Sequence, residues 1–377
     1  MRKILVDMTH ITLNKIYNSL SIYILRILDN VEKEKTGCYV LLITRELEEF
    51  VKNKYPGYEY ILFDVENKWH IKNKLIRTLS LTRLYRSAVN NSKCDILLVA
   101  SDLYLYTCVR TKLKKVVVIH DLKIIKEKCN STVERLKIDI LRKFYYKLMK
   151  SASAVVAISE YTRKDILLYY RNIEEKKINV IANSIALAKI ASKPKGLDDN
   201  SKYILYVNTL QPYKNVITLV KAFSKIKNEI KENLVIVGKT TDYWKNVVES
   251  VIIPNGIKDR VVHLENISDS ELRFLYDNAE LFVTTSLREG FGYTPIEAAV
   301  CECPVISTRC ESLPDVTKNS LFYYDNPTDE NELGNMIKAV ISKRPDKDNL
   351  KSIAEKFKFL YSGKMQIKQF EKLFEKL

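Results

Sequence analysis

Residues 281–300, LFVTTSLREGFGYTPIEAAV, contain a short apolar run, a turn with two glycines and a segment of helix formers in immediate succession. The run Leu281–Thr285 has the aromatic and β-branched residues of a buried strand. Glu289-Gly290-Phe291-Gly292 follows it. A helix is then expected, with Thr294 as its N-cap and Pro295 at its first position. The stretch therefore predicts a strand, a tight turn and a helix, which is the repeating unit of an α/β fold.

The same unit repeats along the whole chain of 377 residues. Short Val, Ile and Leu runs alternate with longer helical segments, which is typical of a parallel sheet covered on both faces. The predicted strands are Lys3–Val6, Tyr39–Thr44, Tyr60–Val65, Ile96–Ala100, Lys115–His120, Ala154–Ile158 and Asn179–Ala182, followed by Tyr203–Val207, Leu234–Val237, Val261–Leu264, Leu281–Thr285, Val305–Ser307 and Leu321–Tyr324. We therefore predict two doubly wound Rossmann-like domains that face a cleft, residues 1–190 and 203–360.

The connections between these domains are also predicted. The segment 191–202, ASKPKGLDDNSK, is polar and has no periodicity, so it is interpreted as the linker. Pro345–Leu377 is a run of helix formers that should give two helices, broken near Ser362-Gly363. The last helix, residues 361–377, is expected to pack back on the first domain.

The positive charge of the chain is concentrated in the first half. The net charge is +16, of which residues 1–190 contribute +15 and residues 191–377 contribute +1. This asymmetry indicates an anionic partner for the first half, and a nucleic acid is disfavoured because no nucleic-acid-binding motif is present. The segments Lys68–Arg86 and Lys123–Lys150 mix basic with apolar residues. They fit either an anionic membrane surface or helices that pack on their own sheet.

Several features favour a cytoplasmic, soluble or peripheral protein. The N-terminus has only a short apolar run before Asp7, so it is interpreted as a strand and not as a signal peptide. Elsewhere the longest apolar runs are about five residues, far below the ~20 that cross a bilayer. The seven cysteines are odd in number and form no C-x-x-C pair, which favours reduced thiols.

The turn Glu289–Gly292 is the first candidate for chemistry, because the whole chain has only nine glycines. A glycine turn that enters a helix N-terminus presents free N–H groups and the positive end of the helix dipole, which suits a phosphate. The alternative is a turn that only needs a positive φ. Glu297 also has a structural alternative, because Thr294–Glu297 fits a capping box.

The glutamates at 289 and 297 around Gly-Phe-Gly, followed by AAVCECPVI at 298–306 and Ser312–Val316, resemble the retaining nucleotide-sugar glycosyltransferases of the GT-B fold. This family includes bacterial mannosyl-, rhamnosyl- and glucosyltransferases of cell-surface polysaccharide synthesis. The resemblance covers most of residues 110–340. It is also carried by Val116–Leu122, Ala157–Thr162, Tyr203–Asn215, Leu234–Gly238 and Val261–Glu271.

The resemblance implies a donor site in the second domain. Lys214 would neutralise the donor diphosphate, Glu289 would hold sugar hydroxyls beside the reacting carbon, and Glu297 would accept hydrogen bonds from the ribose. His120 would contact the donor sugar from the first domain, unless it is only a strand-end histidine capped by a turn. His120 and Glu289 are thus the expected catalytic residues. The other expected donor contacts are Gly238, Lys239, Asn266, Ile267, Arg288, Gly290, Phe291, Gly292, Tyr293 and Thr294.

The sequence departs from the family at two single positions and in one loop. Asn208 and Tyr213 stand where the family usually has glycine and arginine, so one cation at the diphosphate is missing or is supplied by Arg288. The family's glycine-rich loop after the first strand corresponds to Tyr17–Tyr23, YNSLSIY, which has no glycine. In this segment Asn18 and Ser19 remain as hydrogen-bond donors.

No metal or cofactor is expected besides the donor itself. Asp346-Lys347-Asp348 resembles an Asp-x-Asp metal motif, but no core strand precedes it, so it is interpreted as a solvated turn. Cys301 and Cys303 do not have the spacing of a zinc ribbon. In the GT-B fold a lysine and a helix dipole take the place of a metal at the leaving group.

The resemblance thus implies a retaining, metal-independent glycosyltransferase. It would move a hexose or deoxyhexose from a nucleoside diphosphate sugar to a lipid-linked or cell-surface polysaccharide acceptor. Its expected location is the cytoplasmic face of the inner membrane, on an anionic lipid surface. The alternative is a non-catalytic GT-B subunit that binds a glycan or a partner transferase. A sugar-nucleotide epimerase of the same fold would need acid/base carboxylates that the sequence does not place.

Overall fold

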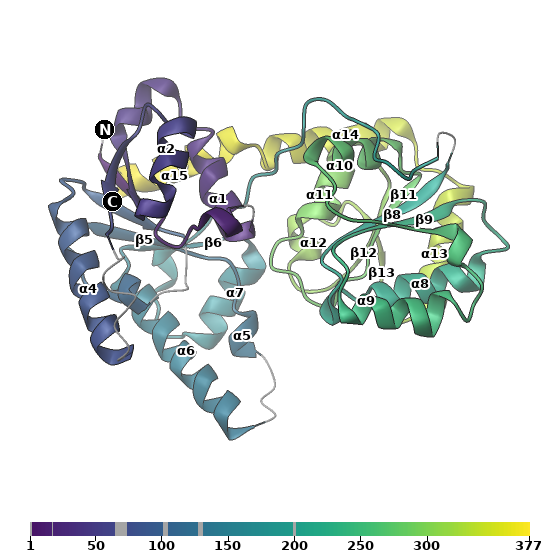
Figure 1. Cartoon of the computed structure of the whole chain (residues 1–377), viewed down its shortest axis with the longest axis horizontal. Coiled ribbons are helices and arrows are strands. Elements are labelled where there is room, and N and C mark those ends of the chain that lie inside the picture. The colour runs from purple at the N-terminus through teal and green to yellow at the C-terminus, as the bar shows by residue number, and fades with distance from the viewer. Residues whose placement is uncertain (1, 17, 65–73, 101–104, 127–130, 199–200) are drawn as a thin grey trace. The chain divides into compact units, whose positions relative to one another are not determined.

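The computed structural model describes residues 2–16, 18–64, 74–100, 105–126, 131–198 and 201–377 (Figure 1). The chain forms two compact units, Met1–Ser184 with Gly363–Leu377, and Ile185–Ser362. One sheet of seven strands and one of six form the centres of these units, and every strand pair is parallel. The predicted doubly wound α/β architecture is therefore confirmed.

The first unit contains the seven-stranded sheet. Its strands are β1 (Ile4–Asp7), β2 (Tyr39–Ile43), β3 (Glu59–Leu62), β4 (Ile96–Val99), β5 (Lys114–Ile119), β6 (Ala154–Ala157) and β7 (Ile178–Val180). They lie in the order β3-β2-β1-β4-β5-β6-β7. The central strands are apolar throughout because helices cover both faces of the sheet.

The helices of the first unit are α1 (Ser19–Leu28), α2 (Glu48–Lys54), α4 (Lys74–Asn91), α5 (Lys123–Lys126), α6 (Thr132–Ser151), α7 (Glu160–Tyr169) and α15 (Gly363–Lys376). Figure 1 shows α1, α2 and α15 on one face of the sheet and α4 and α6 on the other. Serine caps set where two of these helices begin. Ser131 accepts a hydrogen bond from the N–H of Glu134, and Ser159 accepts one from the N–H of Thr162.

The second unit contains the six-stranded sheet. Its strands are β8 (Tyr203–Val207), β9 (Asn233–Val237), β10 (Val261–Leu264), β11 (Leu281–Thr284), β12 (Val305–Thr308) and β13 (Phe322–Tyr324), in the order β10-β9-β8-β11-β12-β13. Its helices are α8 (Val216–Ile226), α9 (Asp242–Val247), α10 (Asp269–Asn278), α11 (Tyr293–Val300), α12 (Leu313–Val316), α13 (Glu330–Ser342) and α14 (Lys347–Leu360). In Figure 1, α8 and α9 lie on one face, and α10, α11 and α14 lie on the other.

All thirteen predicted strands are present, with ends that differ by a few residues. The predicted end of the third strand, Val65, lies outside the described residues. The predicted break near Ser362-Gly363 is also present, because α14 ends at Leu360 and α15 begins at Gly363. Asp346 is exposed and directly precedes α14. Among the described residues, none of the helices is both long enough and apolar enough to traverse a bilayer.

The chain passes from the first unit to the second at Ser184 and Ile185, upstream of the predicted linker 191–202. This segment belongs to the second unit, and its residues 199–200 lie outside the described ones. At the C-terminus, α15 packs on the first unit. The Gln366 side chain donates to the Ala182 carbonyl (3.1 Å) and pairs with the Ser184 hydroxyl (2.8 Å), and Glu371 forms an ion pair with Lys35 (2.9 Å).

Both sheets contain a point where the chain reverses its direction across the sheet. This point lies between β1 and β4 in the first unit and between β8 and β11 in the second. The loops that leave two such strands diverge to opposite faces and leave a crevice at the carboxyl edge. Ligands of open α/β sheets bind in that crevice. The fold thus locates a candidate site in each unit before any side chain is considered.

Candidate functional site

The loops after β8 and β11 bring Lys214 and Glu289 together at the crevice of the second unit. Lys214 ends a short 3-10 helix, Pro212–Lys214. Its carbonyl accepts hydrogen bonds from the hydroxyls of Tyr206 (2.9 Å) and Thr285 (3.0 Å). The N–H of Leu287 donates to the Tyr213 carbonyl at 2.8 Å. These bonds join the two loops, so the position of Lys214 is tied to the end of β11.

The Lys214 Nζ atom lies 2.5 Å from Glu289 Oε2, and the two side chains are only 9% and 16% exposed. The ammonium also lies 5.3 Å from the centre of the Tyr213 ring. Two charges this far from water attract each other more strongly than a surface pair, although each has lost hydration. The pair places one fixed cation and one fixed carboxylate at the crevice, as the predicted donor site requires.

The glycine turn leads into α11 as predicted, but its cap differs. The N-cap is Gly292, with a φ of +91°, and no side chain caps the helix. The prediction of Thr294 as N-cap is therefore wrong, and Thr294 is already helical. Gly292 has no side chain that could cap the first backbone N–H groups of α11. The start of the helix therefore suits an anion.

Glu297 does not form the capping box that was its structural alternative. It is the fifth residue of α11, one turn inside the helix, and is buried. Its Oε2 accepts a hydrogen bond from the Tyr276 hydroxyl at 3.2 Å. Burial, and then the nearby Glu297 carboxylate, raise the pKa of Tyr276 well above 10, so this phenol stays a donor. The capping box fails because the helix begins two residues earlier than predicted.

The residues next to Glu289 in the sequence differ in their exposure to solvent. Arg288, Gly290, Tyr293 and Thr294 are half-buried. The side chain of Phe291 is 2% exposed and packs edge-on against Tyr361, with 5.5 Å between the ring centres. Any contact of Phe291 with a donor would therefore come from its backbone.

The residues predicted for the nucleotide lie at the ends of β9 and β10. A Cβ atom on Gly238 would stand 2.3 Å from the Asn208 carbonyl oxygen, so this close approach needs glycine. Lys239 and Asn266 are exposed and Ile267 is half-buried. With Lys214 and Glu289, these residues occupy the carboxyl edge of four adjacent strands, β10, β9, β8 and β11.

In the first unit, His120 directly follows β5. Its Nε2 lies 3.0 Å from the Ala100 carbonyl oxygen, and the Tyr23 ring meets it edge-on at 4.8 Å. The glycine-free segment begins α1. Asn18 is the N-cap, and its side chain accepts from the N–H of Ser21 at 2.8 Å. Tyr17 lies outside the described residues. The predicted contact of His120 with a donor sugar stays a prediction.

His10, His263 and Glu311 were not singled out from the sequence. His10 follows β1 and is buried, and neither of its ring nitrogens has a hydrogen-bond partner among the described residues. Burial lowers its pKa to about 4, so the ring is neutral. The His263 ring accepts from the Trp244 indole (3.3 Å), and its Nε2 contacts the Gly238 carbonyl (2.8 Å). A position just after a strand was the only available signal for His10.

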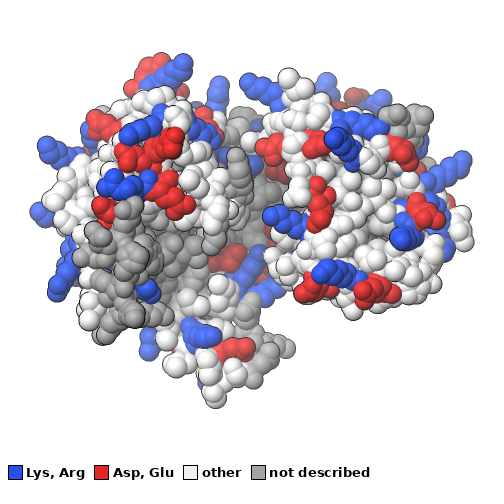
Figure 2. All heavy atoms as spheres, viewed as in Figure 1, with Lys and Arg blue, Asp and Glu red and all other residues white. Residues whose placement is uncertain are grey.

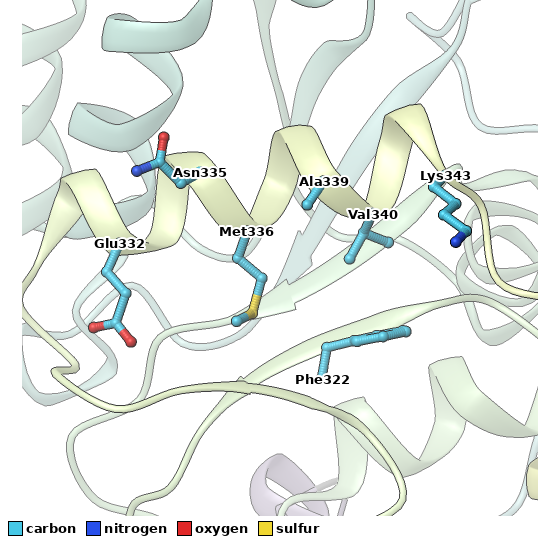
Figure 3. Close-up of a pocket in the computed structure, with 7 residues that line it drawn as sticks. All are labelled: Phe322, Glu332, Asn335, Met336, Ala339, Val340 and Lys343. Carbon is cyan, nitrogen blue, oxygen red and sulfur yellow. The ribbon is translucent and has the colours of Figure 1, made fainter.

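The structure also has a cavity of about 580 Å³ elsewhere in the second unit, between α13 and β13 (Figure 3). Met336, Ala339 and Val340 of α13 point towards Phe322 of β13. None of the predicted site residues is among the residues that line this cavity. Within the described part of the chain, no group of three His, Cys, Asp or Glu side chains is placed to hold a metal ion.

Comparisons with known proteins match both halves of the chain. Residues 188–357 match the family model described as "Glycosyl transferases group 1", and residues 22–189 match "Glycosyltransferase Family 4". The O-antigen chain mannosyltransferase RfbU of Salmonella typhimurium is 32% identical over 211 residues, which cover 55% of this chain and 57% of that protein. The match thus spans about half the length of this curated relative.

Solved structures match over the whole chain. The sucrose-phosphate synthase of Thermosynechococcus elongatus has a TM-score of 0.76 at 16% identity and covers 100% of this chain and 99% of its own. HepE of Anabaena, in complex with UDP and glucose, has a TM-score of 0.73 at 15% identity, with 100% of both chains covered. At such identities the likeness shows the fold. With the two family models, it establishes that the chain belongs to the nucleotide-sugar glycosyltransferases of the GT-B fold.

The packing of the glycine turn gives a first prediction. A Cβ atom on Gly292 would meet Leu313 Cδ2 at 2.5 Å, whereas Gly256, also at positive φ, has no atom within 4 Å of such a Cβ. Gly292→Ala should lower the free energy of unfolding by about 2–4 kcal/mol, and Gly256→Ala by only about 1 kcal/mol. Urea denaturation checks both variants. Equal losses would show that the turn does not pack as described.

Proposed function

We propose that this protein transfers a hexose or deoxyhexose from a nucleoside diphosphate sugar to a lipid-linked or cell-surface polysaccharide acceptor. The observation that carries the proposal is the Lys214–Glu289 pair at the crevice between β8 and β11, beside the uncapped start of α11. The resemblance to an O-antigen mannosyltransferase supports a polysaccharide acceptor. The donor base and sugar are left open.

Lys214 and α11 would stabilise the leaving group. The diphosphate gains negative charge as its bond to the sugar breaks. A fixed cation and backbone N–H groups at a helix N-terminus stabilise that charge without reorganising. A phosphate oxygen bound to the Lys214 ammonium would partly replace the Glu289 carboxylate as its partner. The Glu289 carboxylate would then be available for the sugar hydroxyls.

We further propose that the configuration of the sugar is retained. In this mechanism the acceptor hydroxyl attacks from the face that the diphosphate leaves. The bond between the anomeric carbon and the phosphate oxygen breaks as the acceptor oxygen bonds to that carbon, and the acceptor proton passes to the leaving phosphate. No metal ion is needed, because Lys214 and the helix N-terminus provide the positive charge.

The rival function is a GT-B subunit that binds a glycan or a partner transferase without catalysis. Tyr213 in place of arginine and the absence of glycine from residues 17–23 favour it. The ion pair of Lys214 with Glu289 and the burial of Glu297 favour the enzyme. The two functions differ in a measurable property, because a subunit that has lost its donor site should bind no nucleoside diphosphate.

Substitution of the ion pair tests the proposal. Lys214→Met and Glu289→Gln should each reduce transfer by at least about 100-fold, as expected when a charge-stabilising group is lost. Lys214→Met should also abolish the binding of nucleoside diphosphate measured by calorimetry. Lys225→Met is the matched control, because it removes a cation from a surface pair of the same unit, with Glu330 at 3.2 Å. Wild-type rates in the Lys214 and Glu289 variants would remove this pair from the mechanism.

We also propose that the first unit binds an anionic membrane surface through α6. Phe144, Tyr145, Leu148 and Met149 of this helix are buried, as packing on its own sheet predicts. A second stripe remains in water: Val133, Leu136 and Ile140 are 61%, 63% and 53% exposed. These positions lie on one side of a helix, and the exposed Lys143 and Lys147 continue the stripe.

Apolar side chains flanked by lysines are suited to the interface of an anionic bilayer. In the view of Figure 2, the second unit shows basic and acidic side chains interleaved, in line with the net charge of +1 of residues 191–377. Of the other basic segment, Lys68–Arg86, residues 68–73 lie outside the described residues. The proposal therefore rests on α6.

Vesicle flotation tests this surface. The double variant Leu136→Asp, Ile140→Asp should bind phosphatidylglycerol vesicles at least about tenfold more weakly than the wild type, because it removes apolar contact and adds repulsion. Phe359→Asp is the control, since Phe359 is 65% exposed in the second unit. Equal binding of the wild type and the double variant would assign any membrane contact to another surface.

A further inference from the structure

Glu289 is held by a turn that the sequence did not assign to the site. This turn, Cys310–Leu313, follows β12, the strand that pairs with β11. The N–H of Glu289 donates to Glu311 Oε2 at 2.7 Å, and the Ser312 hydroxyl donates to the Glu289 carbonyl at 2.7 Å. Both polar atoms of the Glu289 backbone are therefore bound by neighbouring residues of one turn.

The backbone of Glu311 is itself unusual. Its φ is +44°, in the left-handed region that a residue with a Cβ atom rarely adopts. Such conformations persist where surrounding contacts enforce them, and they cluster at functional sites. In this conformation the Glu311 carboxylate, in the loop after β12, accepts a hydrogen bond from the N–H of Glu289, in the loop after the neighbouring strand β11. A hydrogen bond from an N–H to a charged carboxylate is stronger than one between neutral groups.

The turn is also packed tightly against Gly292. A Cβ atom on Gly292 would lie 2.5 Å from Leu313 Cδ2 and 3.6 Å from Glu289 Cγ. Burial above all, with smaller contributions from the charges of Glu289 and Glu311, raises the pKa of the Cys310 thiol to about 12. Cys310 therefore stays neutral and adds no third charge to this group.

We propose that Glu311 is a positioning residue, which orients Glu289 towards Lys214 through the Glu289 backbone. The direction of the Cα–Cβ bond of Glu289 depends on its backbone, so loss of the Glu311 bond frees the carboxylate to turn away from Lys214. In this role Glu311 need not touch either substrate. The part of this inference that concerns catalysis rests on the proposed transferase function.

Three variants of Glu311 distinguish the effect of its hydrogen bond to Glu289 from the effect of its strained positive φ. Glu311→Gln keeps an acceptor oxygen, Glu311→Ala removes it, and Glu311→Gly removes it while relieving the positive φ. Glu302→Ala is the matched control. Glu302 is another glutamate of the same unit at positive φ, with a φ of +59°, and it is exposed.

A first measurement does not depend on catalysis. The rate at which acetic anhydride acylates Lys214 is followed by peptide mass spectrometry. Lys214 is buried and paired, so the wild type should react slowly. Glu311→Ala and Glu311→Gly should react severalfold faster, while Glu311→Gln and Glu302→Ala should match the wild type. Unchanged acylation in Glu311→Ala and Glu311→Gly, or an equal increase in Glu302→Ala, would overturn the positioning role.

A second measurement uses the sugar nucleotide that the wild type turns over. Glu311→Ala and Glu311→Gly should lower kcat by about tenfold, the effect expected when one hydrogen bond to a charged group is lost, with little change in the donor KM. Glu311→Gln should restore most of the rate. If both measurements leave the variants like the wild type, Glu311 has no role at the site. If the wild type transfers no sugar, the proposed function fails, and acylation alone decides whether Glu311 positions Glu289.

Discussion

The contact between Lys214 and Glu289 is the interaction that joins the loops after β8 and β11 at the crevice of the second unit. Two opposite charges that are 9% and 16% exposed contribute little net stability, because each has lost most of its hydration. The structure nevertheless fixes both partners with hydrogen bonds to the loops that carry them. We propose that the pair serves a ligand that needs a fixed cation and a fixed carboxylate side by side. A nucleoside diphosphate sugar would present its diphosphate to Lys214 and its sugar hydroxyls to Glu289.

The order of the strands is what brings this pair together. β8 and β11 are neighbours because the chain reverses across the sheet at that point, and the loops of β9 and β12 lie next to them. The glycines at 238 and 292 are needed where backbone and side chains approach too closely for a Cβ atom. The two halves of the chain therefore differ in character. The second unit has little net charge but a buried ion pair, Lys214 with Glu289. The first unit carries almost all the net charge and has an exposed apolar stripe on α6.

The fold could be predicted because central strands of a doubly wound sheet are buried on both faces and appear as continuous apolar runs. The family resemblance named Lys214, Glu289 and Glu297, and the structure places Lys214 and Glu289 in contact, while their roles towards a donor stay predictions. The N-cap of α11 could not be predicted, because Thr294 and Glu297 also fit the pattern of a capping box. The contact of Glu297 with Tyr276 depends on packing between α10 and α11, which the local sequence does not show. The burial of Phe291 depends on Tyr361, which is distant in sequence. Glu311 gave no signal, since its bond to Glu289 exists only once β12 lies beside β11.

We propose that this crevice holds a donor whose sugar is transferred with its configuration retained. The most direct test is proton NMR of the glycan formed by the wild-type protein from a nucleoside diphosphate sugar of known anomeric configuration. The coupling constant of the new anomeric proton should show the same configuration as the donor. The opposite configuration would contradict attack from the face of the leaving group, and with it the proposed retaining mechanism.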